Sequence, residues 1–478
     1  MDVENQTEVS ETTAEHTLRK GSLSTVDAVA QSIALLALVM GVALSTSLAA
    51  QYAGAAAPLA FLVVGLASLC LAYVIIRFTR LRASAGSVYT YIAQGLGPQA
   101  GFVGGWLYGG AFVLGISFVL AIASSYLSAL FGNLHLTVNW LVIFSALLIL
   151  LFIFAFFDVR ISTRIQLVLA GLGVLSVLVL AVLILARGGK SGLSLTPLSP
   201  TAITGGFSGL FFATVFSFTA FIGFEAAAAL GEETARPRVN IPRAILAAVL
   251  IGIVYYVFVT YAMSIGYGIA HASTWARDQA PLDTLANQYA NSGLATFLDL
   301  MVALDAFVAA LAGLNLSSRI IFSMGRDKGI PSFFGWTHPR FKSPWVAILF
   351  GLVVTLILGL TLGRAQGVFG FFAFTATIGS LSVLVAYILI AISWIVFAIR
   401  TVRRPVVLVF DVLLPLIAIL VCGATVYNSV VPAPPSPLNL APYIVGGWLV
   451  LGIIVVVVLW LIAPAQVSTF GKYLADEQ

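Results

Sequence analysis

Long apolar segments separated by short polar stretches recur along the whole chain. Each segment has the roughly 20 residues that an α-helix needs to cross a hydrocarbon core about 30 Å thick. Only helices and closed barrels satisfy their backbone in lipid, and these runs lack the alternation of barrel strands. The pattern predicts an all-α membrane protein with twelve transmembrane helices, at residues 26–49, 58–79, 100–131, 138–157, 161–187, 206–230, 243–270, 297–325, 345–363, 368–399, 407–430 and 440–463.

The composition supports this class and excludes others. Of the 478 residues, 60% are hydrophobic and 9% are charged, whereas about a quarter of the residues of a soluble domain are charged. This excludes a soluble enzyme, a nucleic-acid-binding protein and a disordered chain. Cys70 and Cys422 both lie in apolar runs, which favours buried thiols over a disulfide or a metal site. Because the sequence has no HExxH, P-loop or GxSxG motif, we expect no enzymatic activity, no metal and no cofactor.

The basic residues indicate how the helices are oriented. With the N-terminus inside, 19 of the 23 arginines and lysines fall in inside segments. Inside loops of membrane proteins carry such an excess. We therefore expect a multi-pass protein of the cytoplasmic membrane, surrounded by lipid, with cytoplasmic tails at residues 1–25 and 465–478.

Two predicted helices contain residues that favour an interruption. The first contains Gly41, followed by a Ser-Thr-Ser run, and the sixth contains Gly223 two residues before Glu225. An interrupted helix offers free amides to a carboxylate and free carbonyls to an ammonium group. For Gly41 alone, close packing of helices is the favoured interpretation. For Gly223 the interruption is favoured, because an ionisable residue lies beside it at membrane depth.

The first and sixth helices each begin a block of five. Because five crossings are an odd number, the second block enters the membrane from the opposite side. This is the layout of an inverted-repeat transporter, whose binding site lies between the repeats. The prediction assigns the first repeat to residues 26–199, the second to 200–400, and helices 11 and 12 to 401–464.

Few acidic residues lie within the predicted helices. Asp299 is near a helix end, where interfacial water reaches it, but Glu225 and Asp305 lie deeper. An ionisable residue at such depth is costly and marks a functional site by default. Asp305 has three interpretations: it binds a cationic group of the substrate, carries a coupling proton, or pairs with an arginine or a backbone amide. Glu225 is the other candidate for carrying a coupling proton.

Three stretches resemble bacterial amino acid permeases of the amino acid–polyamine–organocation superfamily. They are residues 221–244 (FIGFEAAAALGEETARPRVNIPRA), residues 84–91 together with 96–106, and residues 315–331. The resemblance implies a LeuT-like 5+5 inverted-repeat core with two extra helices, working by alternating access. It also implies substrate contacts from unwound parts of helices 1 and 6, completed by helices 3 and 8. By position these residues are Met40, Gly41, Val42, Ala43, Gly109, Thr219, Ala220, Phe221, Ile222 and Phe307, with Asp305 beside them. Ser45 is added as a candidate because the first helix departs from the family pattern.

The chain departs from the family pattern at two positions. The first helix reads Met40-Gly41-Val42 where the family usually has Gly-Ser/Thr-Gly, and Gly173 lies where proton-coupled relatives often carry a lysine. Together these observations predict a secondary active transporter of amino acids, working by proton symport or by substrate exchange. An alternative is a carrier of polyamines or basic amino acids that uses Asp305. An alternative of another class is a membrane sensor that does not transport.

Overall fold

The computed structural model describes residues 18, 21–82, 84–133, 135–157, 159–190, 192–401 and 405–471. Over these residues the chain is helical and has no strand, apart from an isolated bridge between Leu23 and Thr234. The α-helices are α2 (Thr25–Leu36), α3 (Leu38–Ala53), α4 (Ala57–Leu81), α5 (Val88–Leu96), α6 (Pro98–Asn133), α7 (Trp140–Phe157), α8 (Val159–Ala186), α9 (Gly206–Phe221), α10 (Pro237–Tyr267), α11 (Ala272–Arg277), α12 (Pro281–Tyr289), α13 (Ser292–Arg326), α14 (Trp345–Leu358), α15 (Arg364–Thr401), α16 (Pro405–Asn428), α17 (Ala441–Ile462) and α18 (Pro464–Val467). Two further short segments are η4 (Ala226–Leu230), a 3-10 helix, and η7 (Gly359–Gly363), a π-helix.

Each predicted apolar segment lies on helical structure, and most ends agree within a few residues. The start of α10 differs most clearly, since it begins at Pro237 rather than at residue 243. Proline suits the first turn of a helix, where its missing amide hydrogen has no acceptor in any case. The apolar pattern could not mark this start because the first turn of α10 is polar.

Ten stretches among the described residues are long and apolar enough to cross a membrane. Two of them, Thr25–Leu81 and Trp345–Thr401, are 57 residues long, well beyond the roughly 20 residues of one crossing. Each contains two of the predicted segments. The structure therefore confirms the all-helical membrane class, while the count of twelve stays a prediction that depends on dividing these two runs.

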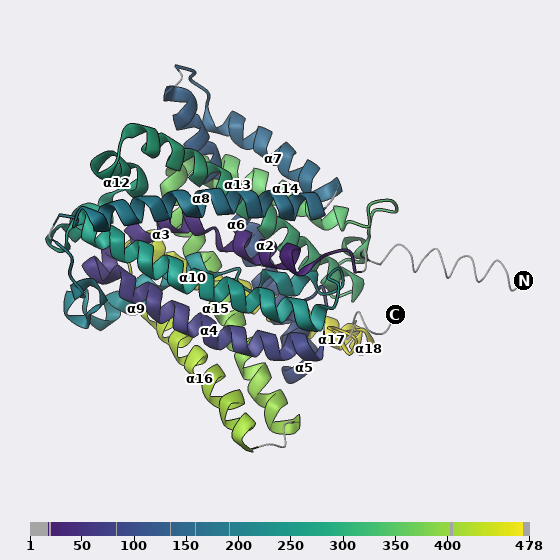
Figure 1. Cartoon of the computed structure of the whole chain (residues 1–478). Helices are drawn as coiled ribbons and strands as arrows, with labels where there is room; N and C mark the ends of the chain where they lie inside the picture. The colour runs from purple at the N-terminus through teal and green to yellow at the C-terminus, as the bar shows by residue number, and fades with distance from the viewer. Residues whose placement is uncertain are drawn as a thin grey trace, which may run out of the picture.

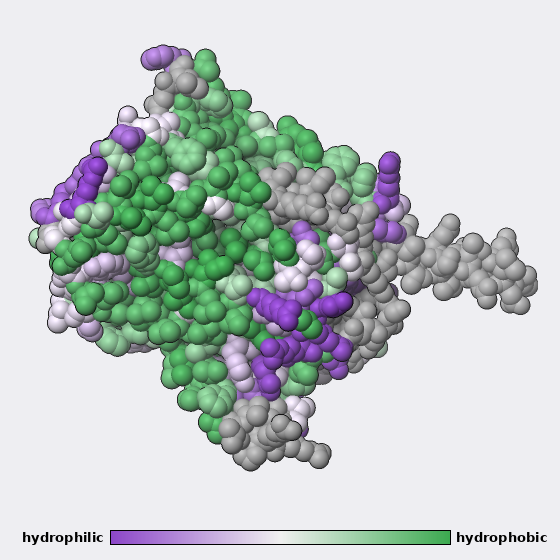
Figure 2. Space-filling model, in the orientation of Figure 1, coloured by the Kyte–Doolittle hydropathy of each residue, from purple (hydrophilic) through white to green (hydrophobic). Residues whose placement is uncertain are grey.

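The helices form one bundle in which α4, α8 and α10 run alongside one another (Figure 1). Hydrophobic residues cover the middle of the face shown in Figure 2, and hydrophilic residues gather toward its two ends. Large apolar side chains such as Val254 and Leu461 are exposed on this bundle. A surface with an apolar middle and polar ends is expected where the solvent around the middle is lipid.

Both ends of the described chain contact the same end of the bundle, where α18 and the start of α2 lie in Figure 1. Leu18 packs against Ala85. A few residues away, the Tyr89 hydroxyl donates to Asp327 at 2.6 Å, and the Gly471 amide donates to the same carboxylate oxygen at 2.7 Å. The two ends of the described chain therefore lie on one side, as an even number of crossings requires.

Candidate functional site

The first predicted membrane helix is interrupted at Ala37. This residue has a left-handed backbone (φ 46°, ψ 58°) and separates α2 from α3. The residues predicted to be unwound, Met40, Gly41, Val42 and Ala43, are regular helix within α3. The predicted position of the break was therefore wrong by about one turn.

The Asp305 carboxylate explains why α3 begins where it does. It reaches from α13, and its Oδ2 accepts hydrogen bonds from the amides of Val39 and Met40, both at 2.9 Å. Amides in the first turn of a helix have no acceptor within that helix, and the N-terminus carries partial positive charge. Asp305 thus caps α3 from a neighbouring helix, which is the backbone-amide interpretation among those predicted for it.

Gly41 serves packing rather than unwinding. A Cβ at this position would lie 2.6 Å from the hydroxyl oxygen of Tyr256, on α10. That hydroxyl donates to the carbonyl oxygens of Leu36, at 2.6 Å, and of Ala220, at 3.0 Å. Leu36 ends α2 and Ala220 lies in the last turn of α9, so one tyrosine bridges both interrupted helices. Nothing in the sequence pattern marks Tyr256, because it lies in an ordinary apolar run.

The sixth predicted helix is interrupted at residues 222–225, between α9 and η4, in agreement with the sequence prediction. Gly223 has φ +112°, a backbone conformation that residues with a Cβ rarely adopt. A Cβ there would also lie 2.5 Å from the side chain of Leu35. The two interruptions therefore pack directly against each other, and this close approach requires glycine.

The Glu225 carboxylate is fully buried and accepts hydrogen bonds from three donors. Tyr108 on α6 donates to Oε1, Tyr387 on α15 donates to the same oxygen at 2.6 Å, and the Gly223 amide donates to Oε2 at 3.2 Å. Glu225 thereby ties the second interruption to two other helices. Tyr387 was not expected from the sequence, because its partner is 162 residues away.

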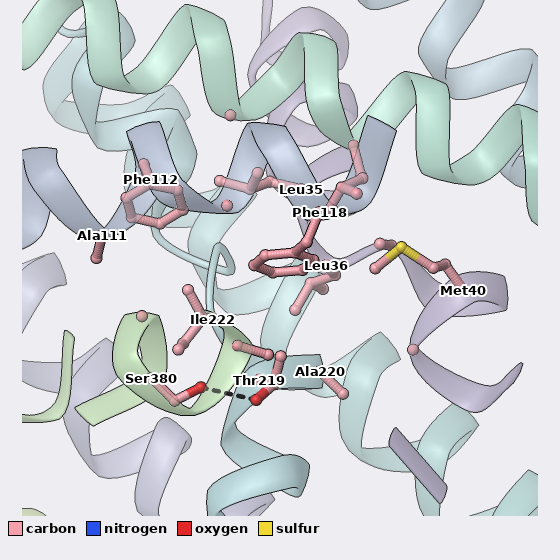
Figure 3. Close-up of a pocket in the computed structure, with 18 of the residues that line it drawn as sticks. Leu35, Leu36, Met40, Ala111, Phe112, Phe118, Thr219, Ala220, Ile222 and Ser380 are labelled. Carbon is pink, nitrogen blue, oxygen red and sulfur yellow. Dashed lines mark hydrogen bonds between the residues drawn. The ribbon is translucent and has the colours of Figure 1, made fainter. Parts of the chain in front are cut away.

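A cavity of about 80 Å³ lies beside both interruptions (Figure 3). A water molecule needs roughly 10–15 Å³ of such space, so the cavity has room for a small solute. Among the described residues, the lining has no charged side chain, and its polar side chains are those of Ser45, Thr219 and Ser380. The hydroxyl oxygens of Thr219 and Ser380 are 2.7 Å apart. Six helices, α2, α3, α6, α9, α13 and α15, and the two interruptions contribute the lining residues. These are Leu35, Leu36, Ala37, Met40, Gly41, Ser45, Ala111, Phe112, Gly115, Ile116, Phe118, Val119, Thr219, Ala220, Ile222, Ala309, Gly313, Ala376, Gly379, Ser380 and Val383.

The predicted substrate-binding residues divide into two groups. Those that line this cavity are Met40, Gly41, Ser45, Thr219, Ala220 and Ile222; those that do not are Val42, Ala43, Gly109, Phe221 and Phe307. Gly109 instead lines a second, apolar cavity of about 630 Å³. Within the described residues, no group of three or more His, Cys, Asp or Glu side chains is placed to hold a metal ion.

Buried ion pairs join the turn after η4 to α13 at the end of the bundle where the termini lie. Arg319 and Glu233 are almost completely buried, and Arg319 Nη2 lies 3.1 Å from Glu233 Oε2. Arg326 pairs with Glu232 at 3.0 Å. Both arginines follow the cavity-lining residues Ala309 and Gly313 on α13, so these ion pairs lie between the cavity and that end. Removing one partner of such a pair is strongly destabilising, by about 3–5 kcal/mol.

An all-helical membrane bundle with a small cavity between two interrupted helices has the architecture of a secondary transporter. Comparison with known families agrees with this class. The profile of the amino acid permease family matches residues 23–459. The chain therefore belongs to the amino acid permease family, and it is a transporter rather than an enzyme.

Individual relatives are more distant. The chain is 27% identical to the branched-chain amino acid permease BcaP of Bacillus subtilis over 380 residues, 74% of this chain and 76% of that protein. It is 27% identical to the low-affinity putrescine importer PlaP of Escherichia coli, over 64% of this chain and 68% of that protein. A crystal structure of MhsT in complex with L-phenylalanine shares the fold, with a TM-score of 0.61 at 15% identity, covering 86% of this chain and all of MhsT.

Proposed function

We propose that the chain moves small amino acids, or the amines that correspond to them, across the cytoplasmic membrane by alternating access. The observation that carries the proposal is the place of the cavity, which is lined by residues from both interrupted helices, such as Met40 and Ile222. A ligand there contacts the ends of both helices at once, and discontinuous helices are where such transporters bind substrates. The names of BcaP, PlaP and the MhsT complex, which mention amino acids and putrescine, support the same range of solutes.

The lining favours a substrate with an apolar body. Leu36, Phe112 and Phe118 point toward the cavity in Figure 3, and burying apolar ligand surface against them is favourable. A second charge on the substrate would find no counter-charge on the lining, and burying an unpaired charge is costly. Neutral apolar side chains are therefore preferred over basic amino acids and diamines.

Alternating access requires that one end of the bundle opens while the other is closed. We place the closed end, with the Arg319–Glu233 pair and both termini, in the cytoplasm, because most basic residues lie on that side. The repeats at residues 26–199 and 200–400 would move against each other, with Gly223 as a hinge. Coupling is by proton symport, with Glu225 or Asp305 as the carrier, or by exchange of substrates.

Uptake into proteoliposomes tests this function. Purified protein should give saturable uptake of at least one solute from a panel of valine, leucine, phenylalanine and isobutylamine, with putrescine added as a disfavoured diamine. Liposomes without protein should give no uptake. Stimulation by an inward proton gradient identifies symport, whereas uptake that needs internal substrate identifies exchange. If no member of the panel enters, the transport proposal is refuted and the sensor alternative is favoured.

A further inference from the structure

The first turn of α3 forms a position for an anion at the edge of the cavity. The amides of Val39 and Met40 point out of the helix end, where partial positive charge gathers. Met40 and the following residue, Gly41, line the cavity. Anions bind readily at such helix ends, so a ligand in this cavity would direct its own carboxylate here if the amides were free.

Asp305 already fills this position. Its side chain is 2% exposed, and its Oδ2 accepts hydrogen bonds from both amides at 2.9 Å. Asp305 is not itself a lining residue, but Ala309, one turn further along the same face of α13, lines the cavity. The carboxylate therefore lies next to the cavity. A ligand carboxylate would therefore meet a like charge and would find both amides occupied.

The other oxygen of the Asp305 carboxylate is Oδ1. Oδ1 is buried, and no hydrogen-bond partner is found for it among the described residues. No lining side chain in the part of the chain that the structure describes carries a positive charge. A buried acceptor without a partner is costly, and a charged one more so. An ammonium group entering from the cavity would provide both the missing donor and the missing charge.

We propose that Asp305 takes the place of the substrate's carboxylate, and that the substrates are small apolar amines without a carboxylate group. This proposal rests on the proposed transport at the cavity between α3 and α9, and it narrows the substrates to one class. One protein carboxylate balances one ammonium, so monoamines fit better than diamines.

Matched pairs of ligands isolate the carboxylate. Isobutylamine is valine with a hydrogen in place of the carboxylate, and phenethylamine relates to phenylalanine in the same way. For the purified full-length protein in detergent, we expect each amine to bind about tenfold or more tightly than its amino acid, because a charge-assisted hydrogen bond is gained and a like-charge contact is avoided. Affinity is measured by the shift of the thermal unfolding midpoint with ligand concentration.

Two variants of Asp305 distinguish the effect of its charge on ligand affinity from the effect of the space that its side chain fills. Asp305→Asn keeps the size and removes the charge, so isobutylamine affinity should fall about tenfold or more without a gain for valine. Asp305→Ala frees the amides of Val39 and Met40, so valine should gain affinity while isobutylamine loses it. Asp299→Asn is the matched control. Asp299 lies on the same helix but is partly exposed, and it is about two turns further from the lining residue Ala309 than Asp305 is, so its substitution should change neither affinity.

The outcomes are distinct from those of the transport test. Tighter binding of valine than of isobutylamine by the unsubstituted protein overturns the inference and leaves the transport proposal standing. Unchanged amine affinity in Asp305→Asn also overturns it, as does failure of every amine to bind. Because the comparison of valine with isobutylamine needs no variant, misfolding of a substituted protein does not block the test.

Discussion

The hydroxyl of Tyr256 holds the two interrupted helices together, and removing it tests that bridge. Tyr256→Phe deletes one oxygen and leaves the ring, which packs against Phe61 and Phe221 with centroid separations of 5.5 and 5.1 Å. The carbonyls of Leu36 and Ala220 then lose a donor that lies at 2.6 and 3.0 Å. The perturbation therefore acts on both interruptions and on little else.

The magnitude follows from the cost of buried carbonyls without donors. Each such group costs about 1–3 kcal/mol. Since one hydroxyl proton is shared between two acceptors, we expect a total near the middle of that range, about 2 kcal/mol. This corresponds to a roughly thirtyfold change in an equilibrium constant. Because the binding-competent arrangement becomes less populated, the apparent dissociation constant of a ligand should rise.

Tyr255→Phe provides an unusually close control. Tyr255 precedes Tyr256 on α10, and its hydroxyl is buried with no hydrogen-bond partner found among the described residues. Removing an unsatisfied hydroxyl should be nearly neutral or slightly stabilising. The assay is the thermal unfolding midpoint in one detergent, combined with ligand titration, for both variants and the unsubstituted protein. Equal behaviour of the two variants would refute the bridging role of Tyr256.

Two further substitutions test packing elsewhere. Gly41→Ala should destabilise the fold by about 1–3 kcal/mol, because the new Cβ would lie 2.6 Å from the Tyr256 hydroxyl oxygen. Gly423→Ala is the control and should not destabilise the fold, because a Cβ there has no neighbour within 4 Å. Equal thermal unfolding midpoints of the two variants would contradict this prediction. Phe470→Ala should lower the free energy of unfolding by about 3–5 kcal/mol, because Phe470 is fully buried. Phe333→Ala is the control, since Phe333 is 42% exposed and its loss should cost less. A comparable loss of stability in both variants, measured in the same way, would show that burial of Phe470 is not what matters.

The membrane class and the helix positions could be predicted from the sequence because they depend on local composition. A run of apolar residues long enough to span lipid must be helical, whatever its neighbours are. The interruption at Gly223 was also predictable, since a glycine beside a buried carboxylate is a local signal. Thr219 and Ile222, which the family resemblance implied as substrate contacts, adjoin that interruption and line the cavity.

The details of the site depend on contacts between helices that are distant in sequence. Asp305 meets Val39 across 266 positions, Tyr256 meets Leu36 across 220, and Tyr387 meets Glu225 across 162. No periodicity along one helix encodes which neighbour it will face.

The sequence by itself thus determined that this chain is a helical membrane protein, which runs are helices, and that the sixth helix is interrupted. Only the tertiary structure decided that the first interruption lies at Ala37 and that Gly41 makes room for a tyrosine. It also decided that Asp305 is directed at backbone amides. The physical reason is that burial in lipid is a property of each segment, whereas hydrogen bonds to free helix ends depend on how the segments pack.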